Sequence, residues 1–435
     1  MMESRHLDRL GRDLMDRTPG DLPTRPAPHD AAPVVSRRGL IAVALAACAS
    51  ASSLGGCALP DNLLQSQQPE SHIEPYLATV YDSDVPVTTA TLMMVGDMLI
   101  HQGVWLSGER SDGTYNYDHF FTHLAKDFSE SDIAIVNQET VLGGTERGLE
   151  SFPDFNSPQE LGEAEVAAGV DVALGATNHA LDHGFDGIRW TLEYWRSHHP
   201  EMVTPGIADT PEEAERIWLI ERQGMTFAIL NYTQFSNHAL PAEDWSLRML
   251  RHSDLPGEVS RARELGADFV VACVHWGTEY VYEPDGPQLR WAEELVEAGV
   301  DAVLGTHPHV LQPVEIYEAA DGRRVPVFWS LGNFVSWQIE KPRMLGGMAK
   351  LVFAKRGDEC QLVEWSLEPV VTHKATDPSM SVYRLSEYTE DLASRNAIHW
   401  AEGCGDFTAA YCRDLAAQIL GPEYDTGSCI LRGTL

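Results

Sequence analysis

Two histidines separated by one residue follow an apolar stretch in "VLGTHPHVLQP", which spans residues 303–313. His307 and His309 are either metal ligands or polar residues at the end of a buried strand. Pro308 fixes its own φ angle and restricts the residue before it, and Gly305 lets the backbone turn tightly. The two imidazoles can therefore point toward different parts of one site. The pair alone does not decide between the two interpretations.

Other polar residues occur at the same kind of position, directly after apolar stretches typical of strands. In open α/β sheets, sites form where the carboxyl ends of strands meet, so we expect these side chains to lie together. A mixture of imidazole, carboxylate and amide ligands suits Mn, Zn or Fe better than Ca²⁺, which prefers oxygen alone. The pattern therefore predicts a divalent metal site. The further residues of this pattern are Asp97, Asn137, Glu139, Asn178, His179, His275, Glu279 and Asn333.

The elements that position these residues alternate between short apolar strands and amphipathic helices, which predicts an α/β fold with a covered sheet. Helix-length segments at 157–169 and 286–299 separate some of the strands. Residues 348–372 predict an antiparallel hairpin that turns at 357–358, and residues 385–420 predict helices. The predicted strands lie at 90–96, 132–137, 170–176, 226–232, 268–277, 300–306 and 325–334.

The N-terminal segment resembles an export signal. Arg37 and Arg38 precede an Ala-rich stretch, as in twin-arginine signals, and residues 54–57 read Leu-Gly-Gly-Cys, as in a bacterial lipobox. A transmembrane anchor is the alternative, but five Ser and Gly residues within 50–56 argue against it. We expect residues 1–57 to direct export. The exported protein is then either anchored to the cell membrane by lipid on Cys57 or located elsewhere outside the cytoplasm.

The charge of the chain excludes one class of partner. It carries 65 acidic and 31 basic residues and a formal net charge of -34. Nucleic-acid binding needs a basic surface, so nucleic acid is a poor partner. Outside the cytoplasm one disulfide among Cys404, Cys412 and Cys429 is expected, with its pairing open, whereas the Cys273 thiol is expected to be buried.

Six motifs follow one another along the chain: "GDMLIH", "NQET", "NHALDHG", "HWGTEY", "GTHPHVLQPVE" and "SLGNFV". In this order they resemble the CapA family of poly-γ-glutamate capsule synthesis proteins, which is similar in turn to calcineurin-like metallophosphoesterases. The resemblance covers roughly residues 90–340. It implies a four-layer αββα sandwich for a domain at 89–371, with a C-terminal hairpin, after a linker at 58–88 and before a helical extension at 372–435.

The resemblance also implies roles for single residues. His179 would protonate a leaving group, and Asp182 either orients His179 or holds the turn of its loop. Asn333 either belongs to the pocket or forms a turn. The implied metal ligands are Asp97, Glu139 (at the position of a carboxylate that bridges two metals), Asn178, His275, His307 and His309. Candidates that would support these ligands by hydrogen bonds are Glu279, Gln312 and Glu315.

The sequence departs from the phosphoesterase pattern at two positions. Leu99 stands where those enzymes carry a histidine, and Ala180 stands where they carry a carboxylate. One metal position therefore lacks a ligand, and the site holds one or two ions. Nothing in the sequence shows whether His101 substitutes for the missing ligand.

Two functions follow from the resemblance and stay open. The first is a metal-dependent hydrolase that helps make, export or trim a poly-γ-glutamate-like polymer, cleaving a γ-glutamyl amide or a phosphoester. The second is a non-catalytic factor that binds polymer and works with membrane capsule machinery. An acidic protein repels a polyanion, so metal ions or arginines near the cleft, such as Arg290 or Arg343, would have to reverse the local charge.

Overall fold

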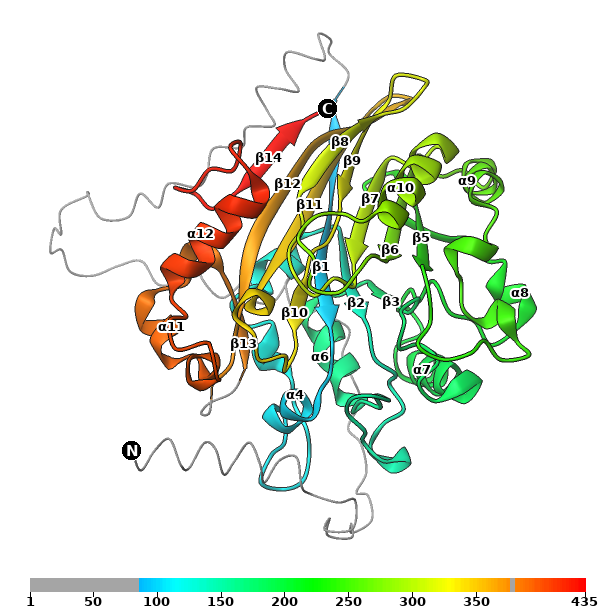
Figure 1. Ribbon diagram of the computed structural model, residues 1–435. Coiled ribbons are helices and arrows are strands. Elements are labelled where there is room, and N and C mark those ends of the chain that lie inside the picture. The colour runs from blue at the N-terminus through cyan, green and yellow to red at the C-terminus, as the bar shows by residue number, and fades with distance from the viewer. Residues whose placement is uncertain (1–85, 376–379) are drawn as a thin grey trace, which may run out of the picture. The chain divides into compact units, whose positions relative to one another are not determined.

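The computed structural model describes residues 86–375 and 380–435 (Figure 1). The predicted export signal, Cys57 and nearly all of the predicted linker lie outside these residues. Its strands are β1 (Thr88–Met98), β2 (Ile133–Gln138), β3 (Val172–Leu174), β4 (Trp218–Arg222), β5 (Met225–Thr233), β6 (Phe269–His275), β7 (Ala302–Thr306), β8 (Val314–Glu318), β9 (Arg324–Phe328), β10 (Asn333–Val335), β11 (Leu345–Arg356), β12 (Glu359–His373), β13 (Ser381–Arg384) and β14 (Leu431–Thr434).

The helices are mostly short. Over the described ranges, none is long and apolar enough to cross a membrane. They are α4 (Gln102–Ser107), α5 (Ala125–Glu130), α6 (Glu160–Ala168), α7 (Gly184–His198), α8 (Pro211–Ala214), α9 (Leu255–Glu264), α10 (Gly286–Ala298), α11 (Glu390–Arg395) and α12 (Ala409–Leu420).

The strands form two sheets. The first has the order β13-β12-β11-β1-β2-β3, with β10 also beside β1 and β14 also beside β12. The second has the order β4-β5-β6-β7-β9-β8. Strands β1, β2 and β3 are parallel, as are β5, β6, β7 and β9, whereas the hairpin β11–β12 joins β1 antiparallel. The hairpin turns at 357–358, as predicted.

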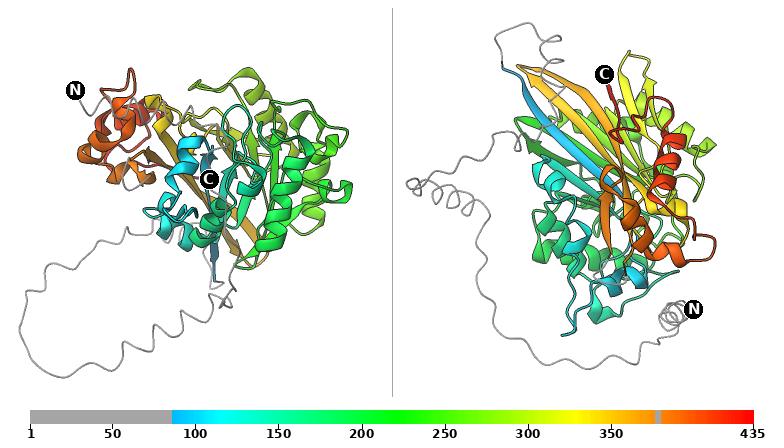
Figure 2. Two further views of the ribbon diagram at one scale, coloured as in Figure 1. Left: turned by 90° about the horizontal axis from the view of Figure 1, so that it is seen from below. Right: turned by 90° about the vertical axis from the view of Figure 1, so that its left-hand side faces the viewer.

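Four layers result from the apolar faces of these sheets, which confirms the predicted αββα sandwich (Figures 1 and 2). Residues such as Met94 of β1 and Ile229 of β5 belong to the core between the sheets. The outer face of the first sheet shares a core with Leu161 of α6, and that of the second shares one with Leu295 of α10. Each central strand is thus apolar on both faces, which explains why its sequence lacks alternation.

The register of the strands places polar residues side by side at one end of the first sheet. Asp97 of β1 lies opposite Asn137 of β2 and Asn333 of β10. This close approach requires glycine at position 96, because a Cβ there would lie 1.9 Å from the carbonyl oxygen of Gly332. In the second sheet, His275 pairs with Thr306 of β7.

The C-terminal segment is helical in part. Helices α11 and α12 lie on the opposite side of the molecule from α9 and α10 (Figure 1), and α12 contributes Leu415 and Ile419 to the core that Trp365 of β12 shares. The sequence did not predict β13 and β14, which pair with β12. They extend the first sheet, so this segment is not purely helical.

The expected disulfide is absent from the described chain, where every cysteine is a free thiol. The sulfur atoms contact separate parts of the backbone: Cys404 Sγ donates to the carbonyl of Ile339, and Cys429 Sγ to that of Thr426. Cys273 is buried in β6, as predicted.

Candidate metal centre and acid–base pair

The six residues predicted as ligands lie together at the carboxyl ends of the strands. Glu139 is shared by two groups whose ligand atoms lie within 4.8 Å of one another, one with His275 and His307, the other with Asp97 and His309. Asn178 joins them, because its Oδ1 lies 2.8 Å from His275 Nε2. All six are at most 2% exposed. The cluster is therefore a buried polar centre surrounded by the two sheets.

The carboxylate of Glu139 gives the strongest indication of a cation. Both of its oxygens are buried and neither has a hydrogen-bond partner. The nearest imidazole nitrogens, His275 Nε2 and His309 Nε2, lie 3.6 and 3.7 Å from Oε1, too far for hydrogen bonds. A buried carboxylate without hydrogen bonds is costly unless a cation compensates it. The donors present therefore fit a divalent metal.

Asp97 is held in place by three neighbours. Asn137 Nδ2 donates to its Oδ1 at 2.8 Å, and the backbone N–H of His307 donates to its Oδ2 at 3.2 Å. The His309 Nδ1 atom lies 3.1 Å from the same Oδ2. Asn137 thus lies beside the ligand cluster, where it orients a carboxylate.

The turn that carries His307 and His309 is made by the histidines themselves. Their φ angles are 97° and 57°, in the left-handed region that non-glycine residues avoid. Such conformations cost about 1–3 kcal/mol each and cluster at functional sites. Gly305 does not provide the turn that the sequence indicated. It lies inside β7, where a Cβ would be 2.1 Å from the carbonyl oxygen of Trp329.

The two histidines have opposite protonation tendencies. Burial lowers the pKa of His307, and the neighbouring His275 and His309 lower it further. Burial also opposes protonation of His309, but the carboxylates of Glu139 and Asp97 outweigh burial and raise its pKa to about 9. His307 is thus a neutral imidazole, the form that can bind a metal. Without a metal, a proton on His309 partly compensates the negative charge of Glu139 and Asp97.

His179 and Asp182 form a pair beside this centre. His179 Nδ1 lies 2.7 Å from Asp182 Oδ2, and both side chains are almost fully buried. The same Oδ2 accepts the backbone N–H of Phe155 at 2.7 Å, and the Phe155 ring contacts the His179 ring edge-on with centroids 4.8 Å apart. Asp182 therefore contacts His179 directly and also holds the neighbouring loop.

The other pocket candidates divide into two groups. Asn333 Oδ1 lies 3.0 Å from His309 Nδ1, and the carboxylate of Glu279 lies near both His307 and His309. Gln312 instead pairs with Gln288 at 2.9 Å, and Glu315 is an exposed residue of β8. The structure thus does not bring Gln312 and Glu315 to the ligands, because the chain after His309 runs away along an edge strand.

The departures from the phosphoesterase pattern remain visible in the structure. Leu99 is buried at 3% exposure and offers no donor. His101 does not join the ligand groups. Its Nδ1 accepts the backbone N–H of Trp337 at 3.3 Å, and its ring contacts that of Phe155, which in turn contacts His179.

Sequence reasoning missed several residues that contact the site. Thr306 Oγ1 lies 3.0 Å from His275 Nδ1, and Asn237 Nδ2 lies 3.4 Å from the His179 nitrogens. Thr306 directly precedes His307, so its position was a usable signal. Asn237 comes from a loop without a motif and gave no signal.

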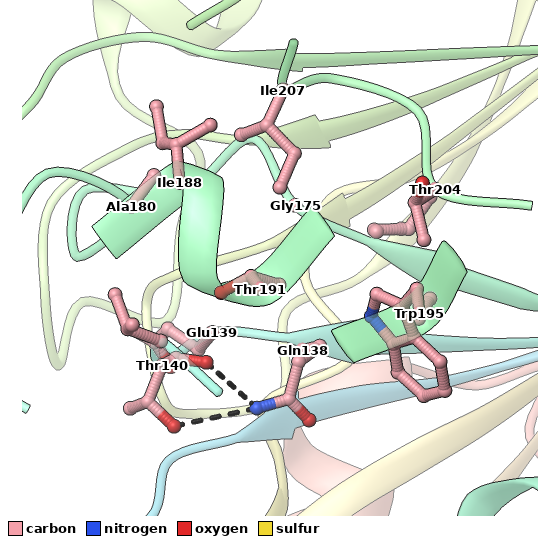
Figure 3. A pocket seen from close by; sticks show the side chains of 13 residues that line it. Gln138, Glu139, Thr140, Gly175, Ala180, Ile188, Thr191, Trp195, Thr204 and Ile207 are labelled. Atoms are coloured by element: carbon pink, nitrogen blue, oxygen red, sulfur yellow. Dashed lines mark hydrogen bonds between the residues drawn. The ribbon is translucent and has the colours of Figure 1, made fainter. Parts of the chain in front are cut away.

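A small cavity is lined by Glu139 and its neighbours in sequence, Gln138 and Thr140 (Figure 3). Helix α7 covers it with Ile188, Thr191 and Trp195, and Gln138 Nε2 donates to the carbonyl of Thr140 at 2.8 Å along its floor. Its lining is largely apolar and holds no cluster of ligands. The cavity is thus a packing gap behind the β2 end rather than a second site.

Much of the chain is similar to known proteins. Residues 91–338 match the family described as "Bacterial capsule synthesis protein PGA_cap". The PGA biosynthesis protein CapA of Bacillus subtilis (strain 168) is 25% identical over 321 residues, 72% of this chain and 80% of that protein. The capsule biosynthesis protein CapA of Bacillus anthracis is 28% identical over 254 residues, 56% of this chain and 59% of that protein.

A solved structure, the NAD nucleotidase of Haemophilus influenzae, aligns with 68% of this chain and 53% of its own at 10% identity and a TM-score of 0.38. That similarity is too low to say anything about activity. The family match covers more than half of the chain. The chain therefore belongs to the bacterial capsule synthesis protein PGA_cap family.

Proposed function

We propose that the protein is a metal-dependent hydrolase that cleaves an anionic, γ-linked glutamyl polymer during capsule synthesis. The observation that carries the proposal is the unpartnered, buried carboxylate of Glu139 among imidazoles, next to the His179–Asp182 pair. The names of the relatives, which refer to PGA and capsule biosynthesis, support the polymer as substrate.

The chemistry divides between the ligands and the acid–base pair. A divalent metal at this centre would supply a nucleophile near neutral pH and polarise the oxygen of the scissile bond. Asp182 Oδ2 accepts a hydrogen bond from His179 Nδ1–H, which leaves Nε2 to pass a proton to the leaving group. Asn237 limits rotation of the ring. The residues that would hold the metal are Asp97, Glu139, Asn178, His275, His307 and His309.

The place of action is part of the proposal. The twin-arginine motif before an Ala-rich stretch, followed by the lipobox-like residues 54–57, supports export and lipid attachment at Cys57. An anchored protein would meet the polymer and the membrane capsule machinery at the cell envelope.

A second function is favoured by Leu99. An apolar, buried side chain at that position leaves one metal position short of a ligand. The protein would then bind polymer without cleaving it, with the metal centre stabilising the fold.

The experiment that separates the two functions compares three proteins: the wild type, His179→Ala and the control His252→Ala, which changes an exposed histidine. Metal content is measured first, and then the shortening of poly-γ-glutamate and the cleavage of a phosphodiester. We expect the wild type and control to cleave the polymer and His179→Ala to lose about 100-fold or more of the rate with its metal retained.

The outcomes have distinct meanings. Metal binding without cleavage of either substrate would support the non-catalytic function. Cleavage that survives His179→Ala would contradict the role of His179, and a wild type without metal would contradict the metal centre itself.

A further inference from the structure

An arginine lies beside the metal centre in spite of the strongly acidic composition of the chain. Arg343 belongs to a short 3-10 helix at Lys341–Met344. Its guanidinium carbon lies 3.5 Å from the centroid of the Tyr280 ring, whose own centroid is 6.2 Å from that of His309. Its backbone carbonyl accepts the Nδ2 of Asn333, the residue that contacts His309. Arg343 is thus tied to the site through both backbone and side chain.

The guanidinium of Arg343 has donors to spare. Its side chain is 14% exposed, and its Nε is buried without a hydrogen-bond partner. Within the described ranges its ion-pair partner is Glu340, 2.5 Å away, whose side chain is 59% exposed. An ion pair with an exposed carboxylate contributes little and exchanges readily. The two terminal nitrogens in the planar fork of the guanidinium can bind an oxyanion side by side when Glu340 is displaced, so Arg343 keeps the capacity for a bidentate anion.

Tyr280 fixes the orientation of the Arg343 guanidinium. Its backbone has a φ of 66°, and its N–H donates to the carbonyl of Pro308 at 2.8 Å. The turn that carries His307 and His309 therefore also holds the ring on which Arg343 stacks. A stacked, planar cation keeps its orientation better than a freely rotating side chain, which favours geometric recognition of an oxyanion.

Two other arginines in the described part of the chain are placed differently. Arg290, which the sequence also suggested, lies on α10 with a 60% exposed side chain, 3.7 Å from Glu294. It is a solvated surface residue. Arg384 is engaged by both Asp127 and Glu368.

We propose that Arg343, stacked on Tyr280, binds an oxyanion of the substrate next to the unit that lies at the metal centre. In a γ-glutamyl chain this group is the free α-carboxylate of the neighbouring residue, so Arg343 selects an anionic polymer over a neutral one. The inference rests on the proposed function, because it assigns the substrate charge to that same site. It also explains how a chain with a net charge of -34 accepts a polyanion.

Binding measurements test the subsite without turnover. The full chain carrying His179→Ala, loaded with Mn²⁺, is titrated calorimetrically with a γ-linked glutamate pentamer, with its α-amidated counterpart and with inorganic phosphate. Added to this background, Arg343→Gln is expected to weaken binding of the glutamate pentamer about tenfold or more and to leave the amidated pentamer unchanged. Arg343→Lys keeps the charge but not the fork, so it should recover only part of the affinity. Arg290→Gln is the matched control and should bind as its parent does.

The titration with inorganic phosphate shows whether the oxyanion at Arg343 is a carboxylate or a phosphate group. A tenfold loss for phosphate but not for the pentamer would still support an oxyanion subsite, with a phosphoester as its substrate. Equal binding of every anion by Arg343→Gln and its parent, an equal loss for the amidated pentamer, or no anion binding by the parent would overturn the inference. A wild type that binds the pentamer but does not hydrolyse it would contradict the proposed hydrolase and leave the subsite standing.

Discussion

At the scale of single residues, Glu139 decides how the site is interpreted. It is central to the ligand groups, and its two oxygens lack the hydrogen bonds that buried carboxylates normally have. Asp97, by contrast, receives donors from Asn137 and His307. The difference favours a bound cation as the partner of Glu139, since without metal a proton on His309 offsets this charge only in part.

Replacing Glu139 by Gln tests this interpretation. The variant should lose the rise in unfolding temperature that added Mn²⁺ or Zn²⁺ gives the wild type, because the central charged ligand is gone. In EDTA we expect only a small change in unfolding temperature, because the substitution removes a buried charge without a hydrogen bond but also the attraction of Glu139 for the proton on His309. Thermal unfolding followed by circular dichroism checks both. An unchanged metal-induced rise would contradict the role of Glu139.

The sequence predicted which strand-end residues lie together better than it predicted the loop residues around them. Residues such as Asp97 and His275 were found because each ends an apolar strand and parallel strands end at one edge. Gln312 was assigned to the site from its nearness in sequence, yet it supports a loop. Arg343 and Tyr280 could not be assigned a partner, because their contact depends on how two loops without periodicity meet in space.

At the scale of elements, the end of β1 controls the geometry of the ligands. It lies between β2 and β10 and makes its register shifts around Met94–Met98. The central strands could be predicted because their sequences are apolar without alternation, as expected for strands buried on both faces. The edge strands β4 and β8 were not, because they are short and largely half-buried, so their sequences resemble those of loops.

Gly96→Ala should disturb both the fold and the metal centre. The new Cβ would lie 1.9 Å from a backbone oxygen of Gly332, which cannot move aside as a flexible side chain would. We expect a loss of about 1–3 kcal/mol in the free energy of unfolding, together with weaker metal binding through a shifted Asp97. Urea unfolding in EDTA and a metal titration measure the two effects.

Gly286→Ala provides the matched control, because its added Cβ meets no atom within 4 Å at the start of α10. Equal stability of Gly96→Ala and Gly286→Ala would show that β1 and β10 can separate without cost.

At the scale of the whole molecule, the site exists only when both sheets are packed together. The first sheet supplies Asp97 and Glu139, and the second supplies His275 and the turn with His307 and His309. The sandwich was predictable from the motif order, since the ligands recur after strands of both sheets. The packing of the outer helices could not be predicted from the sequence. Glu165 of α6 is an example, because an acidic residue in a helix is expected at the surface and this one is buried.

Glu165 makes global stability depend on pH. It is fully buried on α6, neither carboxylate oxygen has a hydrogen-bond partner, and burial raises its pKa from 4.5 to about 8. Below pH 4.5 the carboxyl is protonated in both folded and unfolded chains. As the pH rises toward 8, the unfolded chain releases this proton while the folded chain retains it, so the fold loses stability until Glu165 ionises in both states.

Glu165→Gln should therefore match the wild type near pH 4 and exceed it increasingly up to about pH 8, by an amount on the order of a few kcal/mol. Urea unfolding of both proteins in EDTA between pH 4 and 9 measures the difference, in which the titration of all other groups cancels. A difference that stays constant across this range would show that Glu165 is ionised in the folded protein, and hence that α6 admits a partner or water to its buried face.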